Sequence, residues 1–230
     1  MKRLLGLIVM LFTLPGCIKY YELSDSEFNQ GKPLDDNRDV AVAYRRSVTI
    51  YDQFKTQAIF DGLWLSDTVR STYVDMHASK RGIQGDGKEE LLKRQLEENN
   101  HWLSFILLAD IRDKLFASMS EPASTWTAHA VVDNVKLVAE SVKEFDMDPE
   151  FQLLFGKTWN PFQTAYMVKL PLESVLAHKI ASGEHKEVKL VISSMYKEAE
   201  LVWKTGQLSA KKEVLRDEDF YWCWPPGLRP

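Results

Sequence analysis

The chain has 230 residues, of which 45% are hydrophobic and 27% charged, and its formal net charge is −4. These proportions are ordinary for a globular protein and leave room for one large domain or two small ones. An acidic chain without a basic run argues against nucleic acid as the main partner and against electrostatic binding to anionic lipid. With only two cysteines, Cys17 and Cys223, a framework of several disulfides is excluded.

The first residues have the pattern of an export signal. Lys2 and Arg3 precede an apolar run from Leu4 to Leu14, which is shorter than the about 20 residues that a membrane-spanning helix needs. Positive charge followed by a short apolar run is typical of a secretory signal peptide. Residues 1–16 are therefore predicted to be a signal peptide.

The end of this run, Leu14-Pro15-Gly16-Cys17, resembles the lipobox of bacterial lipoproteins, where a leucine and small residues precede a lipid-bearing cysteine. Pro15 stands where that motif usually has a small residue. The resemblance implies that Cys17 is the lipid attachment site, carrying a diacylglyceryl thioether and often an amide-linked acyl chain such as palmitate. Two or more acyl chains hold a protein stably on a membrane. An ordinary secretory signal followed by an unmodified cysteine is the alternative.

The same resemblance favours the outer membrane over the inner membrane, because Ile18 follows Cys17 where an inner-membrane lipoprotein would carry aspartate. It ends at Cys17 and implies no family for the rest of the chain. Residues 17–38 are rich in polar residues, glycine and proline, which cannot bury enough apolar surface to fold. They are predicted to be a lipidated tether.

Residues 39–101 are predicted to form a hairpin of long helices. The segment Gly82–Gly87 interrupts the helical pattern, which resumes from Lys88 to Asn100. A core-facing helix is the first interpretation of the spacing, and a partner-binding coiled coil is the alternative. Apolar residues recur at steps of mostly three and four before this break: Val40, Tyr44, Val48, Tyr51, Phe54, Ala58, Leu65, Val69, Tyr73 and Met76.

Residues 102–216 are predicted to be a β-rich domain. Asp133-Asn134 is a hairpin turn signal, and Asp148-Pro149 predicts a short helical turn. Several short strands at this spacing suggest an antiparallel sandwich. The fold class is therefore α+β, a long-helix hairpin followed by a β-sandwich-like body. The expected strands are Leu103–Ala109, Trp126–Val132, Val135–Val138 (which also fits a helix), Thr164–Leu172, Val188–Met195 and Glu198–Lys204.

The last segment, residues 217–230, is an aromatic and proline-rich tail. Its large rings are Phe220, Tyr221, Trp222 and Trp224. They are predicted to pack over the sandwich or the helical arm, because such a patch rarely stays in water. A partner-docking role for the tail is the alternative. Cys223 is interpreted as a buried thiol, with an intermolecular disulfide as the alternative.

No catalytic, metal or cofactor site is predicted. Gly82–Lys88 superficially matches a phosphate-binding loop, but Glu89 replaces its hydroxyl residue and a helix precedes it, so no nucleotide partner is expected. The histidines lack metal-ligand spacing, and His178 and His185, which flank a polar loop, are interpreted as surface residues. No nucleophile motif is present.

These observations predict a membrane-anchored bacterial surface or periplasmic lipoprotein with a non-enzymatic binding or assembly role, such as an accessory subunit of an envelope machine. Its partners would be the membrane, through the lipid, and a protein or envelope component. The alternative is a cell-wall-directed hydrolase or carbohydrate-binding module. Aromatic side chains in a shallow groove would favour that alternative, with Trp126, Trp159 and Trp203 as candidates.

Overall fold

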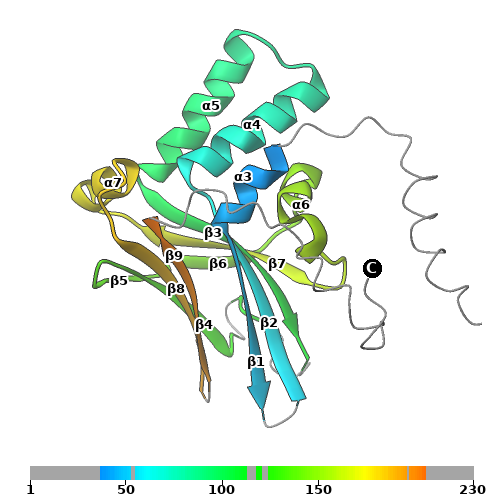
Figure 1. Ribbon diagram of the computed structural model, residues 1–230, viewed down its shortest axis with the longest axis vertical. Helices are drawn as coiled ribbons and strands as arrows, with labels where there is room; N and C mark the ends of the chain where they lie inside the picture. Colours follow the sequence, from blue (N-terminus) through cyan, green and yellow to red (C-terminus); the bar gives the residue numbers. More distant parts are fainter. Residues whose placement is uncertain (1–36, 53–54, 113–117, 121–123, 196, 206–230) are drawn as a thin grey trace, which may run out of the picture. The chain divides into compact units, whose positions relative to one another are not determined.

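The computed structural model describes residues 37–52, 55–112, 118–120, 124–195 and 197–205, and these form two antiparallel sheets and several helices (Figure 1). The five-stranded sheet contains, in spatial order, β1 (Arg45–Asp52), β2 (Lys55–Trp64), β3 (Trp102–Ile111), β7 (Thr164–Pro171) and β6 (Ser141–Glu144). The four-stranded sheet contains β5 (Val135–Val138), β4 (Trp126–Val132), β8 (Glu187–Ser194) and β9 (Glu198–Lys204).

The helices are α3 (Asn37–Tyr44), α4 (Asp67–Arg81), α5 (Asp86–Asn99), α6 (Pro149–Phe155) and α7 (Ser174–Ala181), with a 3-10 turn η3 (Gly156–Thr158). Figure 1 shows α3, α4, α5 and α6 on the same side of the five-stranded sheet. The predicted α+β class with a sandwich of antiparallel sheets is therefore confirmed. None of the described helices combines the length and apolar composition that a membrane span requires.

The central strand β3 is buried on both of its faces. Phe105 and Leu107 point into the core between the two sheets, whereas Ile106 and Leu108 point into a second core beneath the helices. Successive side chains of a strand alternate between faces, so a continuous apolar run is what a doubly covered strand needs. The run Leu103–Ala109, predicted to be a buried strand, meets this requirement.

The turn signal in the sequence correctly predicted a hairpin of the four-stranded sheet. Asp133 and Asn134 have positive φ angles of 46° and 75°, the conformation that a two-residue hairpin turn requires. They join β4 to β5, so the strand interpretation of Val135–Val138 is confirmed over the helical one. The expected strands Val188–Met195 and Glu198–Lys204 correspond to β8 and β9, which pair with each other.

The predicted helix from Asp39 to about Lys80 is wrong over Arg45–Asp52 and Lys55–Trp64, which are strands. Arg45–Asp52 and Lys55–Trp64 form the paired strands β1 and β2, and β2 pairs with β3. Strands from before and after residue 101 thus share one sheet. Steps of three and four also occur by chance in a broad apolar stretch, and β-branched and aromatic residues favour a strand once a partner strand is available. Such residues in this hairpin include Val48, Thr49, Ile50, Ile59 and Phe60.

Gly62 marks a close approach between the two sheets. This residue lies in β2, where an added Cβ atom would come 2.7 Å from Leu201 Cδ1. A glycine in a strand often marks such a contact. The missing side chain leaves room for β9 against β2.

Several predicted features lie outside the described residues. These are the signal peptide at 1–16, the predicted tether at 17–38 as far as residue 36, with Cys17, and the tail with Phe220, Tyr221, Trp222, Cys223 and Trp224.

Candidate functional site

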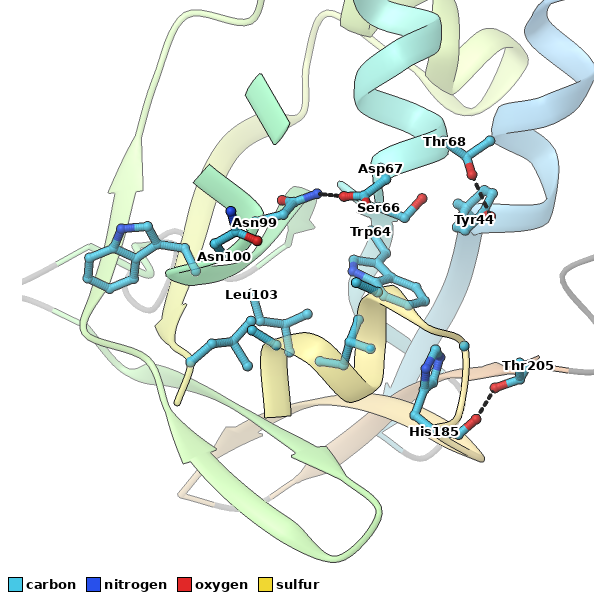
Figure 2. Close-up of a pocket in the computed structure, with 16 residues that line it drawn as sticks. Tyr44, Trp64, Ser66, Asp67, Thr68, Asn99, Asn100, Leu103, His185 and Thr205 are labelled. Carbon is cyan, nitrogen blue, oxygen red and sulfur yellow. Dashed lines mark hydrogen bonds between the residues drawn. The ribbon is translucent and has the colours of Figure 1, made fainter. Parts of the chain in front are cut away.

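A pocket of about 210 Å³ lies where the ends of β2, β3 and β9 meet α7. Its apolar wall consists mainly of Trp64, Leu103, Leu172, Ala177 and Ile180, and Asp67, Thr68 and Asn99 are among its polar lining residues. Figure 2 shows these groups, with the ring of His185 directed toward Trp64. The pocket is the strongest candidate for a functional site among the described residues.

Local chain geometry brings His185 into this pocket. Gly183, with φ of 73°, follows the end of α7, and its N–H donates to the carbonyl of Ile180 at 3.1 Å. A left-handed glycine is a common way to end a helix. The chain then turns toward β8, where the Thr205 hydroxyl donates to the His185 carbonyl. This turn places the imidazole beneath Trp64.

Asp133 fixes the same turn from the β4–β5 hairpin. Its carboxylate accepts from the backbone N–H of Lys186 at 2.8 Å and pairs with Lys179 Nζ at 2.6 Å. The hydrogen bonds from Lys179 and Lys186 lower the pKa of Asp133 to about 2. The position of the imidazole therefore depends on a residue more than 50 positions earlier in the chain.

The His185 side chain is buried away from solvent. The residue is 4% exposed, and neither ring nitrogen makes a hydrogen bond of normal geometry to the described residues. Burial lowers the pKa of His185, although the nearby Lys179 carbonyl and Asp133 act in the opposite direction. The lowered pKa favours the neutral form of the ring, in which one nitrogen donates and the other accepts.

Aromatic rings form the wall next to this imidazole. Trp64, 4% exposed, meets His185 edge-to-face with ring centroids 5.6 Å apart, and meets Tyr44 similarly at 5.9 Å. The Tyr44 hydroxyl donates to Thr68 Oγ1 at 3.2 Å. Edge-to-face contacts hold aromatic side chains in defined orientations. The wall is therefore fixed before any ligand arrives.

The polar groups at the pocket rim are already paired. Asn99 Nδ2 donates to Asp67 Oδ1 at 2.6 Å, and Asn99 Oδ1 accepts from Arg70 Nε at 2.7 Å. Ser66 caps the start of α4 by accepting from the N–H of Val69. Contacts within the protein therefore hold the rim in place.

A network of ion pairs and hydrogen bonds centred on the buried Arg70 supports this rim. Arg70, 2% exposed, donates through Nη1 to Gln95 Oε1 and to Glu98 Oε2, both at 2.8 Å. Glu98 also binds Lys169 of β7. Together these contacts connect α4, α5 and the five-stranded sheet.

A second polar cluster lies between α4 and α6. Tyr73 stacks on Phe151 with centroids 4.2 Å apart and donates to Asp148 Oδ2 at 3.1 Å. Burial and the neighbouring Asp148 raise the pKa of Tyr73 to about 12. His77 Nδ1 lies 3.8 Å from Glu150 Oε1. We interpret this cluster as a packing contact between the two helices.

The predicted site residues are placed differently from the sequence expectation. Trp126 and Trp203 are 5% and 0% exposed and lie in the core between the sheets, so they form no groove on the surface. Trp159 is half-buried beside α6.

The interpretation of His185 as a surface residue is wrong, because the residue is buried. Its neighbours in the sequence, Ser182 to Glu184 on one side and Lys186 and Glu187 on the other, are small or polar. They gave no local signal that His185 is buried.

The residues that line the pocket are of the kinds that bind a ligand. A neutral imidazole activates a nucleophile only when both are within hydrogen-bond reach and a third group orients the ring, and His185 has neither contact among the described residues. No three His, Cys, Asp or Glu side chains in the described ranges gather as a metal site would require.

In comparisons with known proteins, no family model and no curated protein matches this sequence.

Proposed function

We propose that this chain is a lipid-anchored lipoprotein of the bacterial cell envelope that acts by binding rather than by catalysis. The observation that carries this proposal is the His185 pocket, an apolar space of about 210 Å³ whose aromatic wall is held in place by ring contacts. Pockets lined by apolar side chains with a few placed polar groups are typical of binding sites. The lipobox-like segment ending at Cys17 supports the envelope location, with the outer membrane favoured.

The alternative of a cell-wall hydrolase or carbohydrate-binding module has less support. It depended on aromatic side chains in an open groove, and two of its three candidate rings, Trp126 and Trp203, are in the core. An accessory role in an envelope machine fits a protein with a binding pocket and an aromatic tail. In this proposal the tail residues Phe220, Tyr221, Trp222 and Trp224 remain a candidate docking element.

Site-specific photo-crosslinking in cells tests the binding role. A photoreactive phenylalanine analogue would replace Thr68 or Ala181 at the pocket, and Lys93 or Lys143 as matched exposed controls. We expect a discrete adduct from the pocket positions that the control positions do not give. Adducts of equal yield at all four positions, or none at the pocket, would contradict a binding role for this face.

The anchor gives a separate prediction. Cys17→Ser removes the thiol that would carry the lipid, so we expect the protein to move from the detergent phase to the aqueous phase on detergent phase separation. The physical reason is that about 0.8 kcal/mol per buried CH₂ of acyl chain is lost. Metabolic labelling with an alkyne fatty acid provides the control, because wild type should be labelled and the variant should not. Unchanged partitioning of the variant would refute the anchor.

A further inference from the structure

The connection between α6 and β7 displays the most exposed large hydrophobic side chain among the described residues. Phe162 is 90% exposed, and its neighbour Pro161 is exposed as well, whereas Trp159 is half-buried. We call residues 157–162 the Phe162 loop. Single exposed apolar side chains are common on protein surfaces, so the exposure of Phe162 is informative only if the protein holds the ring in place.

Hydrogen bonds hold this connection in a defined turn. The N–H of Phe162 donates to Asn160 Oδ1 at 3.0 Å, and the N–H of Asn160 donates to Gln163 Oε1 at 3.0 Å. Gln163 Nε2 in turn donates to Oδ2 of Asp61 in β2 at 2.9 Å, and Asp61 is 7% exposed. The turn is thus fixed to the five-stranded sheet, and the described residues leave the ring of Phe162 uncovered.

A shallow groove of about 450 Å³ lies beside Trp159, between the end of α4 and α6. Its charged lining side chains are two exposed lysines, Lys80 of α4 and Lys157 of η3, and none of its described lining residues carries a carboxylate. Neither lysine is paired with a carboxylate elsewhere among the described residues. Aromatic side chains and unpaired positive charges therefore share this part of the surface.

This combination is typical of a surface that lies in a membrane interface. Tryptophan is enriched at the level of the lipid headgroups, and a lysine side chain can cover apolar surface while its charge stays in water. Protein interfaces, in contrast, are depleted in lysine. The aromatic rings supply the main attraction, so the contact does not depend on the anionic lipid that the acidity of the whole chain disfavours.

The predicted anchor would bring a membrane to this part of the protein. Cys17 precedes Asn37, where α3 begins, by 20 positions, and a flexible chain of that length spans about 25 Å. α3 packs against α6, as Figure 1 shows, and Val42 of α3 lies beside Phe155 and Thr158. A helix of eight residues is only about 12 Å long, so a lipid on Cys17 can reach past α3 to the Phe162 loop.

We propose that the Phe162 loop inserts into the surface of the lipid bilayer that holds the anchor. Phe162 enters the boundary between headgroups and acyl chains, and Trp159 lies at the level of the headgroups. Lys80 and Lys157 face the lipid phosphates. The inference rests on the lipid anchor of the proposed function and adds the orientation of the protein on its membrane. Figure 1 shows α7, which lines the His185 pocket, well apart from α6, so this orientation leaves the pocket accessible.

Fluorescence quenching tests this orientation on the full lipidated chain, reconstituted into vesicles of equal parts phosphatidylcholine and phosphatidylglycerol. An environment-sensitive fluorophore would be attached at Pro161→Cys or, as the matched control, at Val175→Cys on α7, which is 79% exposed. Cys223→Ser prevents labelling of a second thiol. Because interfacial segments lie about 5–10 Å into the boundary between headgroups and acyl chains, lipids with a nitroxide near the headgroup should quench the fluorophore at position 161 and vesicles should shift its emission to shorter wavelength. The fluorophore at position 175 should show neither effect.

A substitution shows whether the exposed ring drives the contact. Phe162→Asp places a charge where insertion needs an apolar group, so quenching at position 161 should fall to the level of the control position. Val175→Asp, the same change at a similarly exposed position of α7, should leave quenching at position 161 unchanged. Melting curves would verify that both variants are folded.

The proposal is overturned if the fluorophores at positions 161 and 175 are quenched equally, if neither is quenched, or if folded Phe162→Asp retains the quenching. Short-wavelength emission at position 161 without nitroxide quenching would also overturn it, because protein, such as the aromatic tail or a second copy of the chain, would then cover the loop. Fatty-acid labelling of Cys17 separates the anchor from the contact. A labelled Cys17 without quenching refutes the contact and leaves the anchor standing, whereas an unlabelled Cys17 refutes the anchor and the contact with it.

Discussion

Replacing Trp203 with alanine should lower the free energy of unfolding by about 3–5 kcal/mol, the usual cost of removing a fully buried large aromatic side chain. Trp203 of β9 is 0% exposed and packs against Phe105 of β3 with centroids 5.2 Å apart, across the space between the sheets. Its ring also meets Trp64 at 6.4 Å. Chemical denaturation followed by circular dichroism would measure the change.

A more conservative variant separates the ring from its hydrogen bond. The Trp203 indole N–H donates to the Tyr44 carbonyl at 2.7 Å. Trp203→Phe keeps most of the ring and loses this donor, so its effect should be smaller, about 1–3 kcal/mol. Trp159→Phe, at a half-buried position near the surface, is the matched control and should change little. An alanine variant as stable as the Trp159 control would show that the two sheets do not depend on this residue.

The second large effect is expected at Arg70. Arg70→Met should lower the free energy of unfolding by about 3 kcal/mol, because it removes the buried partner of this ion pair and leaves the half-buried Glu98 with Lys169 alone among the described residues. The Arg70 side chain is 3% exposed, and its partner Glu98 is 27% exposed. Gln95 and Asn99 would lose donors at the same time. Urea denaturation at pH 7 would measure the loss.

An exposed ion pair on α5, the helix that carries Glu98, supplies the control. Lys93 and Glu97 lie 3.9 Å apart on α5, with side chains 78% and 60% exposed, and exposed pairs contribute about 0–1 kcal/mol. Lys93→Met should therefore have little effect. Equal effects of Arg70→Met and Lys93→Met would show that burial of the Arg70 network is not what stabilises the α4–α5 pair.

The same network predicts a pH dependence. Burial by itself raises the pKa of Glu98, but the hydrogen bond from Lys169 and the charge of Arg70 outweigh it and lower the pKa overall. A carboxylate with a lowered folded pKa stabilises the fold above its ordinary pKa, and that contribution is lost as the pH falls through the folded value. Glu98→Gln should therefore flatten the acid side of the stability profile relative to wild type.

Local signals in the sequence determined much of the β-sandwich. The Asp133-Asn134 turn, the run Leu103–Ala109 and the alternation in β8 and β9 each depend on neighbouring residues only. A turn needs a particular backbone conformation at two positions, and a strand between two layers needs apolar residues on both faces. The sequence therefore predicted these elements close to their observed bounds.

Residues 45–64 show where a local pattern was insufficient. The same apolar residues fit a helical stripe and a strand pair, and the choice depends on pairing with β3, about 50 residues later. Such pairing is a tertiary interaction that overrides local preference. In contrast, Val69, Tyr73 and Met76 lie on the buried face of α4, as their spacing predicted.

The candidate site was decided by tertiary structure alone. His185 lies in a polar stretch of sequence, and it is buried because Trp64 of β2, Thr205 at the end of β9 and the Asp133 turn meet around it. Likewise, nothing near Arg70 in sequence predicts its partners on α5. Composition and turn chemistry determine which segments become strands or turns, whereas burial of one polar side chain depends on segments that only folding brings together.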